Sequence, residues 1–328
     1  MMVNSDFNTP ILLLVFNRPK ETNFLFEHIR AIRPPKLFIA CDGPREGNED
    51  DVKDIAEVMS IVKNIDWDCE CKYLFRDKNL GCGKAVLSAF TWFFSEVERG
   101  IILEDDCIPN LSFFKFCQEM LFRYENIDKI MAISGTNIMS DFVSPSDYVY
   151  SSFPIMWGWA TWKRAWEKFD IEMKDWPYVT KNTKLITHGI YKWRKHPVFI
   201  EYFKNTYKKV NQKELAWDHQ WIFSNWLNNG LTVVSSKNLI HNIGFGEKSN
   251  STKEDNLNRE NLGSFFSYPP YVSPKIIAVN EKLDLYIRKK WFQATWFYYL
   301  KIILLRINFI KGTWFFIKQK KKKWKRQS

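Results

Sequence analysis

Between Pro10 and Phe122, short apolar runs alternate with stretches whose apolar residues recur at helical spacing. A continuous apolar run is typical of a strand buried on both faces, and the other stretches predict amphipathic helices. Because the two kinds alternate with short connections, we expect an α/β fold with a mostly parallel, Rossmann-like sheet flanked by helices. The expected strands are 10–16, 36–41, 69–75 and 101–104, and the expected helices are 19–30, 51–63, 84–97 and 110–122.

Beyond Met120 this alternation loosens. Strands are expected at 129–134, 148–153 and 231–235, a helix at 214–226, a flexible loop at 241–246 and a polar stretch at 247–261. We therefore divide the chain into 1–135 and 136–275, as two halves of one domain, followed by a terminal segment at 276–328.

All four early strands end in polar residues at one presumed edge of the sheet. The carboxyl ends of strands in open α/β sheets are where ligands bind. A single pocket accounts for all of these residues, whereas a purely structural interpretation needs four independent polar turns. The polar strand ends are Asn17 and Arg18, Asp42, residues 76–83, and Glu104 to Asp106.

The last of these strand ends carries three consecutive acids, Glu104, Asp105 and Asp106. Adjacent carboxylates repel one another, so the arrangement is costly unless a positive group lies beside it. Mg²⁺ or Mn²⁺ would serve, since both prefer carboxylate oxygen and keep substrate phosphates among their ligands. The alternative is an acidic turn before a helix capped by Asn110.

The glycine-containing loop at 81–84 precedes the third helix. It lacks the third small residue of a dinucleotide fingerprint and the full spacing of a P-loop. It still offers backbone N–H groups, a helix N-terminus and the cation of Lys84 to a phosphate.

Composition adds two expectations. The chain is 17% aromatic with 15 tryptophans, and aromatic faces are good platforms for sugar rings. Trp157, Trp159 and Trp162 surround a glycine and predict a stacking wall for an acceptor sugar, with core packing as the alternative. The 6 cysteines, together with the absence of a signal-peptide pattern at the start of the sequence, predict reduced thiols in a cytosol.

Taken together, these motifs make the chain from about Pro10 to Gly246 resemble the GT-A glycosyltransferases, in particular the bacterial family-2-like enzymes and the N-acetylglucosaminyltransferase I group. The resemblance rests on residues 15–19, Asp42-Gly43, 76–84, 102–106, 157–162, Asp218 and 242–246. It implies a metal-dependent, inverting glycosyltransferase of the hexosyl- or N-acetylhexosaminyl-transferring kind. The donor would be a nucleotide-diphospho-sugar, UDP-linked, and the acceptor a glycan or lipid-linked glycan in bacterial surface polysaccharide synthesis.

The resemblance also implies roles for single residues and halves. Residues 1–135 would bind the nucleotide sugar and 136–275 the acceptor. Asn17 and Arg18 would lie near the nucleotide, Asp42 would contact the base, and Arg76, Asn79, Gly81 and Lys84 would hold ribose and diphosphate. Glu104 and Asp105 would face the donor, Asp106 would bind Mn²⁺ or Mg²⁺, and Asp218 would be the catalytic base. Relatives often carry a histidine shortly after the 242–246 loop, whereas residues 247–252 here contain none, so His241 is the candidate second metal ligand.

The chemistry would follow from charge. A nucleotide diphosphate leaves as an anion, which a metal neutralises, and the acceptor hydroxyl loses its proton to a carboxylate as it attacks. Trp217 and Trp221 beside Asp218 would raise the pKa of that carboxyl toward the working range. The alternative for Asp218 is an N-cap of the following helix.

The terminal segment is apolar with a cationic stripe and ends in a polybasic run at 318–326. Charged residues interrupt it before the roughly 20 apolar residues that a transmembrane helix needs. We expect an amphipathic helical segment that lies on an anionic membrane surface, placing the protein peripherally on the cytoplasmic face of the cell membrane. The alternative is a helix packed on the domain.

Two other function classes stay open. A sugar nucleotidyltransferase shares the architecture, but the loop after the first strand lacks a glycine-rich, basic signature for a triphosphate. A non-enzymatic basic protein that binds membrane or nucleic acid would fit the net charge of +11. We expect no nucleic-acid partner, because basic and aromatic residues are not interleaved outside the tail.

Overall fold

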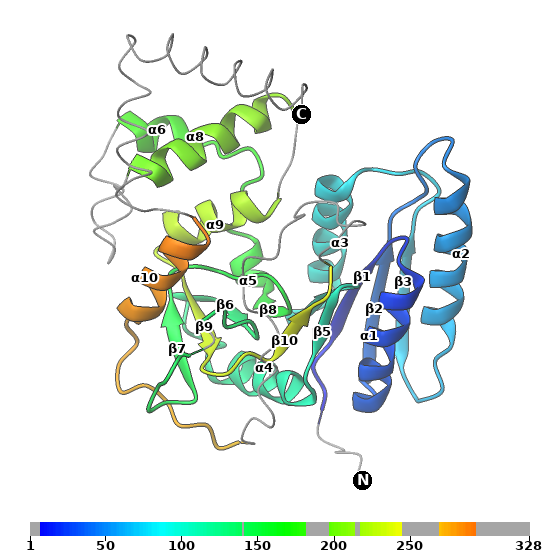
Figure 1. Ribbon diagram of the computed structural model, residues 1–328, viewed down its shortest axis with the longest axis horizontal. Coiled ribbons are helices and arrows are strands. Elements are labelled where there is room, and N and C mark those ends of the chain that lie inside the picture. The colour runs from blue at the N-terminus through cyan, green and yellow to red at the C-terminus, as the bar shows by residue number, and fades with distance from the viewer. Residues whose placement is uncertain (1–6, 140, 182–196, 214–216, 245–268, 293–328) are drawn as a thin grey trace, which may run out of the picture.

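The computed structural model describes residues 7–139, 141–181, 197–213, 217–244 and 269–292 (Figure 1). An 8-stranded sheet runs in the order β3-β2-β1-β4-β8-β6-β9-β7, and a second sheet pairs β10 with β5. The strands are β1 (Ile11–Val15), β2 (Lys36–Cys41), β3 (Glu70–Phe75), β4 (Arg99–Glu104), β5 (Cys107–Pro109), β6 (Ile130–Ser134), β7 (Tyr148–Ser151), β8 (Trp159–Trp162), β9 (Leu231–Ser235) and β10 (Ile240–Asn242). The helices are α1 (Pro19–Ile32), α2 (Glu49–Lys63), α3 (Cys82–Glu96), α4 (Leu111–Arg123), α5 (Lys163–Trp166), α6 (Trp176–Lys181), α8 (Pro197–Asn211), α9 (Trp217–Leu227) and α10 (Glu281–Lys290).

The first four strands form the parallel part of the sheet. β1 lies between β2 and β4, and β3 pairs with β2 at the sheet edge. Their carboxyl ends therefore meet at one edge. The predicted α/β class, with a mostly parallel sheet flanked by helices, is confirmed.

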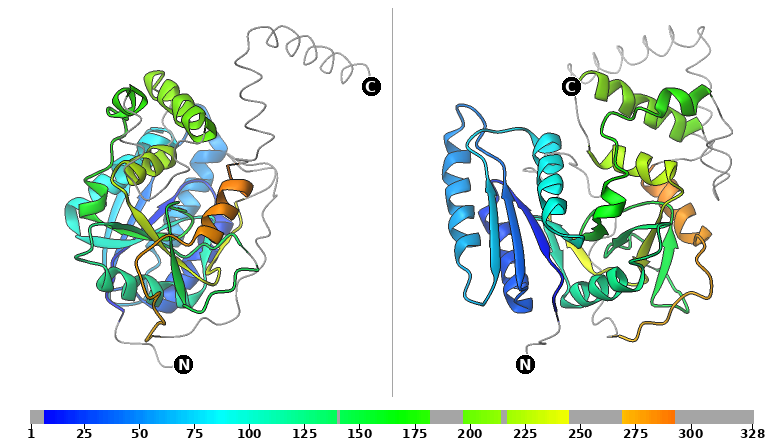
Figure 2. Two further views of the ribbon diagram at one scale, coloured as in Figure 1. Left: turned by 90° about the vertical axis from the view of Figure 1, so that its left-hand side faces the viewer. Right: turned by 180° about the vertical axis from the view of Figure 1, so that it is seen from behind.

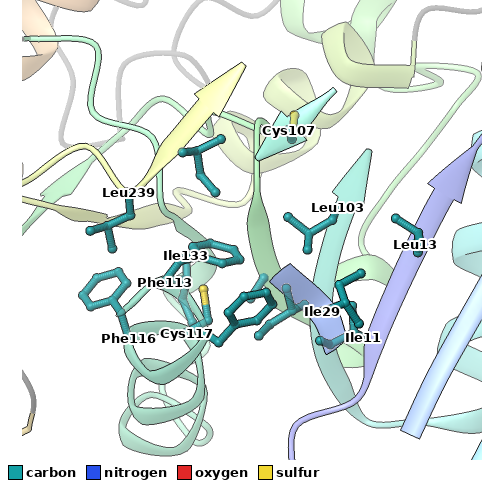
Figure 3. Close-up of a cluster of buried hydrophobic side chains, with 14 of the residues drawn as sticks. Ile11, Leu13, Ile29, Leu103, Cys107, Phe113, Phe116, Cys117, Ile133 and Leu239 are labelled. Carbon is teal, nitrogen blue, oxygen red and sulfur yellow. The ribbon is translucent and has the colours of Figure 1, made fainter. Parts of the chain in front are cut away.

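Strand alternation divides the core of this part into two layers. Leu13 and its neighbours two residues away face the layer that contains α1, α2 and α4, and Leu12 and Leu14 face the layer that contains α3 and α9. Figure 3 shows the first layer, in which Phe113 and Cys117 of α4 approach the sheet. The sheet is thus buried on both faces, as its unbroken apolar strands predict.

The second half joins the same sheet through strands that do not follow chain order. β8 runs antiparallel between β4 and β6, and β9 lies between β6 and β7. The expected flexible loop at 241–246 is wrong in its first two residues, because His241 and Asn242 pair with Ile108 and Cys107 in the β10–β5 ribbon. The pairing satisfies backbone groups that would otherwise be buried beside the core.

The terminal segment begins inside the folded domain. Leu283 and Ile287 of α10 are buried, and the Asp284 carboxylate accepts hydrogen bonds from the Ser151 and Ser152 hydroxyls at 2.6 Å each. Figure 2 shows α10, in orange, lying against the domain, where it contacts β7. The start of the predicted tail at residue 276 is therefore wrong for α10, which packs on the domain. The part of the tail from residue 293 onward lies outside the described residues, and none of the described helices is long and apolar enough to span a membrane.

Candidate functional site

Arg18 and the acids of β4 form the centre of the ligand edge. The Arg18 Nη1 lies 3.1 Å from the Asp105 Oδ1 and 2.7 Å from the Asp106 Oδ2. The other Asp105 oxygen accepts the Phe16 backbone N–H at 3.3 Å, which ties the end of β4 to the end of β1. The positive group that the acid triplet requires is thus supplied in part by the chain itself.

The acids of this cluster are perturbed by burial and by one another. Burial, followed by the negative charges of Asp106, Asp105 and Asp218, raises the pKa of Glu104 to about 8, against the effect of Arg18. Burial likewise raises the pKa of Asp105 to about 7, again with a contribution from Asp106 and against the effect of Arg18. One guanidinium therefore leaves the cluster short of positive charge.

Asp218 reaches this cluster from the other half of the chain. A short turn at 228–230 joins α9 to β9, and the N-terminal turn of α9 lies beside α3, close enough for the Asp218 charge to act on Glu104. Phe90 of α3 packs edge-on against Trp217 with ring centroids 5.0 Å apart, which fixes the first turn of α9 beside α3. Asp218 lies in that turn, about half exposed, and its charge acts on Glu104 and, after burial and Glu104, on the Cys82 thiol.

Two residues that the sequence did not single out surround Asp218. The His219 Nε2 lies 3.9 Å from the Asp218 Oδ2, and its imidazole packs on the ring of Tyr202 in α8 with centroids 4.8 Å apart. Burial lowers the pKa of His219 while Asp218 raises it, and burial followed by Asp218 raises the pKa of Tyr202. The adjacent letters Asp218-His219 were the only available signal for His219, and none pointed to Tyr202.

Asp42 binds backbone N–H groups with both of its carboxylate oxygens. Its Oδ1 accepts the N–H groups of Gly43 and Leu80, and its Oδ2 accepts those of Leu80 and Gly81. Three backbone N–H groups thus share its two oxygens, and Asp42 holds the loop before α3. Its contact with the base stays a prediction.

Three other predicted donor-binding residues shape the same loop. The Asn79 amide donates to the Gly43 carbonyl and accepts the Gly81 N–H, and Gly81 has a φ of +79° that favours glycine. The Arg76 Nη2 donates to the Ser88 hydroxyl at 2.5 Å and to the Ala85 carbonyl at 3.3 Å. Arg76, Asn79 and Gly81 thus lie at the ligand edge, as predicted, with hydrogen bonds that support α3.

Lys84 and Asn17 differ in how they are held. Lys84 is exposed in the first turn of α3, makes no ion pair with a described residue, and lines a hollow of about 490 Å³ along that helix. Asn17 donates to the Asp51 Oδ1 at 2.8 Å, and hydrogen bonds from Arg45 lower the pKa of Asp51 to about 2. Asn17 is therefore fixed at the edge, while the Lys84 ammonium keeps its freedom.

Of the three tryptophans predicted to form a stacking wall, two lie in the core. Trp159 is 1% exposed and stacks on Trp217 with ring centroids 6.0 Å apart, and Trp162 is 2% exposed with its indole N–H on the Leu121 carbonyl. The predicted acceptor role is wrong for Trp159 and Trp162, because neither ring face is accessible. Trp157 is half-buried and packs against Trp291 with centroids 4.8 Å apart.

The donor chemistry of the acid cluster fits Mg²⁺ or Mn²⁺. Asp105 and Asp106 each direct one carboxylate oxygen at the same Arg18 nitrogen, so two hard oxygen ligands converge on one point. A Cβ at Gly244 would collide with the Asp106 carboxylate, so only glycine lets the chain pass there. Within the described residues, no group of three or more His, Cys, Asp or Glu side chains forms a ready ligand set.

His241 stays a prediction as a metal ligand. It lies in β10 opposite Ile108, two positions beyond Asp106, and makes no hydrogen bond or ion pair with Asp106 in the part of the chain that the structure describes. Phe245 and Gly246 of the motif that implied this role lie outside the described residues.

The fold and the site define a chain of the α/β class with a charged ligand edge. No family model matches the sequence, and no curated protein matches it. Among solved structures, the chain is similar to a cytidylyltransferase from Leptospira borgpetersenii (TM-score 0.31, 15% identity, 54% of this chain and 73% of that one). It is also similar to mouse xyloside xylosyltransferase 1 (TM-score 0.31, 10% identity, 66% and 80%) and to HddC from Yersinia pseudotuberculosis (TM-score 0.29, 10% identity, 48% and 77%). At these scores the similarity carries no argument about the reaction.

Proposed function

We propose that the protein is a glycosyltransferase that uses a nucleotide-diphospho-sugar as donor and Mn²⁺ or Mg²⁺ as cofactor. The observation that carries the proposal is the approach of Asp218, from α9, to the acids at the end of β4. Group transfer from a diphosphate donor needs a cationic side for the leaving group and a carboxylate for the acceptor hydroxyl. A divalent cation held by Asp105 and Asp106, together with Arg18, would supply the first side, and Asp218 the second.

Each side has a separate task. Asp218 is half exposed, so its carboxylate is available to accept a proton from an acceptor hydroxyl. Such a direct displacement inverts the anomeric centre. Arg18 and Lys84 bring positive charge to the edge where a diphosphate would lie, and the α3 N-terminus adds its backbone N–H groups.

Asp105 and Asp106 would hold the divalent cation, which supplies charge neutralisation for the departing diphosphate. Glu104 is half-buried beside them at the end of β4, where a bound cation would favour its ionised form.

The test is a thermal-shift panel of nucleotide sugars with and without Mn²⁺, followed by product analysis with the donor that binds. A donor that stabilises the protein only with metal supports the proposal. Asp106→Ala is expected to abolish this stabilisation, whereas Asp66→Ala, which removes an exposed acid away from the edge, leaves it unchanged.

The same panel decides the alternative. A sugar nucleotidyltransferase would be stabilised by a nucleoside triphosphate and would release pyrophosphate in the presence of a sugar 1-phosphate. Against this, the loop between β1 and α1 is short and lacks the glycine-rich, basic sequence that would hold a triphosphate. Pyrophosphate release without sugar transfer would replace the glycosyltransferase proposal.

We further propose that the acceptor is a glycan or lipid-linked glycan met at the cytoplasmic face of a membrane. The basis is the apolar and polybasic sequence after α10. Full-length protein is expected to sediment with anionic liposomes, less so at high salt, and protein lacking 293–328 is expected to remain in solution. Equal sedimentation of the two would remove the membrane proposal and leave the donor chemistry untouched.

A further inference from the structure

A single nitrogen of Arg18 occupies the point where two carboxylates converge. Its Nη1 donates to the Asp105 Oδ1 at 3.1 Å and to the Asp106 Oδ2 at 2.7 Å. The three side chains are only 10–18% exposed, so water screens this contact weakly. The guanidinium therefore occupies the position that suits a small cation bound by both acids.

The surroundings allow little room for a second cation at that point. Gly244 presses against Asp106 on one side, and the Phe16 N–H binds the remaining Asp105 oxygen on another. Two positive groups at one point would also repel each other. A metal that binds Asp105 and Asp106 together must displace the guanidinium.

We propose that Arg18 is an internal counter-cation: it neutralises Asp105 and Asp106 in the nucleotide-free protein, and the divalent cation that accompanies the donor exchanges with it. The inference rests on the proposed function. The released guanidinium then becomes available to a phosphate oxygen of the donor, so metal and nucleotide each favour the binding of the other. Nucleotide-free protein consequently binds metal weakly.

The test measures Mn²⁺ binding to nucleotide-free protein by electron paramagnetic resonance. If Arg18 is released in only one molecule in ten, its competition lowers the apparent affinity about tenfold. Arg18→Gln is therefore expected to bind Mn²⁺ about tenfold more tightly than wild type or better. The gain must vanish in the double variant with Asp106→Asn, because the site then lacks its carboxylate.

Two variants control for charge. Arg45→Gln removes the same positive charge from a guanidinium at the same edge, one that pairs with Asp51 instead, and is expected to leave Mn²⁺ affinity unchanged. Arg18→Lys keeps the charge and is expected to bind as weakly as wild type. An Arg18→Gln affinity equal to that of wild type, or a gain shared by Arg45→Gln, overturns the proposal.

A second measurement covers the case in which Arg18→Gln does not fold. Guanidinium signals of wild-type protein are recorded by nitrogen NMR and assigned by their loss in Arg18→Lys. Addition of Mg²⁺ with UDP is expected to shift the Arg18 signals, and unchanged signals overturn the exchange. One result would contradict the Arg18 proposal alone: wild type binds Mn²⁺ only with UDP, and Arg18→Gln binds Mn²⁺ no more tightly than wild type when UDP is absent. A different result, in which neither wild type nor any variant binds Mn²⁺ even with UDP, would contradict the metal-dependent function.

Discussion

The two halves of the sheet differ in the directions of their strands and in how regularly strands alternate with helices. In the order β3-β2-β1-β4, all strands are parallel, and each is followed along the chain by a helix or by the acidic turn of β4. In the order β8-β6-β9-β7, strands run in both directions, and β8 inserts between β4 and β6 although it follows both along the chain. The first half repeats one strand–helix pattern, and the second half does not.

This difference decides where the site residues come from. The parallel half delivers Arg18, Asp105 and Asp106 to one edge through strand direction alone. The second half contributes Asp218 because the first turn of α9 packs against α3. The first arrangement follows from an alternating pattern, whereas the second requires the topology.

The largest expected effect tests the junction of the halves. Asp218→Asn removes the carboxylate that would accept the acceptor's proton, and turnover should fall about 100- to 10,000-fold. Binding of the donor nucleotide should stay unchanged, since its ligands lie in the first half. Transfer assays and calorimetry measure the two quantities.

The control for this variant is Asp141→Asn, an exposed acid in a turn of the second half. It is expected to keep full turnover. Near-normal turnover in folded Asp218→Asn would mean that Asp218 is not the catalytic base.

Most of the structure of the first half could be predicted from the sequence, but little of the second half could. Four strands, their helices and the Asn110 cap were predictable, because each depends on residues within one unit. The sequence predicts ligand stacking by Trp159 and Trp162, because a cluster of aromatic residues does not reveal that β8 lies inside the sheet. Asp42 was correctly placed at the edge, but its bonds to Leu80 and Gly81 depend on a loop nearly 40 residues away.

The next prediction separates core from site in the second half. Trp159→Ala should lower the free energy of unfolding by about 3–5 kcal/mol, because a buried indole leaves a cavity. Trp157→Ala, at a half-buried position, should cost less. Urea denaturation followed by circular dichroism compares the two variants. A stable Trp159→Ala protein with weakened acceptor binding would instead support the acceptor-stacking role of Trp159.

The Asp284 carboxyl makes the stability of the second half depend on pH. Burial raises its pKa to about 6, against the hydrogen bonds from Ser151 and Ser152 that lower it. Between the ordinary aspartate pKa and 6 the folded state holds a proton that the unfolded state has lost, so this group makes the fold less stable as pH rises. From pH 4 to pH 7 this penalty grows by about 2 kcal/mol.

Asp284→Asn should remove that slope. The free energy of unfolding of the variant, relative to wild type, should rise by about 2 kcal/mol between pH 4 and pH 7. Urea denaturation at both pH values gives this double difference. A constant difference across the range would mean that the carboxyl titrates normally in the folded state.

The smallest expected effect asks whether α10 belongs to the cooperative fold or to a tail. The Asn280 side chain caps α10 by accepting the Leu283 N–H at 3.0 Å, and the Asn280 N–H donates to the Tyr150 carbonyl at 2.7 Å. Asn48 caps α2 in the first half in the same way, accepting the Asp51 N–H at 3.0 Å. Loss of such a cap costs about 1 kcal/mol when the helix unfolds with the domain.

We therefore expect Asn280→Ala and Asn48→Ala to lower the free energy of global unfolding by similar amounts, about 1 kcal/mol each. If α10 instead frays as part of a tail, Asn280→Ala will leave the urea midpoint unchanged while Asn48→Ala lowers it. Hydrogen exchange at the Leu283 amide distinguishes the two directly, because a helix that belongs to the fold exchanges only through global opening. Since Leu283 and Ile287 are 0% and 1% exposed, detaching α10 would uncover the core face of β7, and this couples the cap to the whole domain.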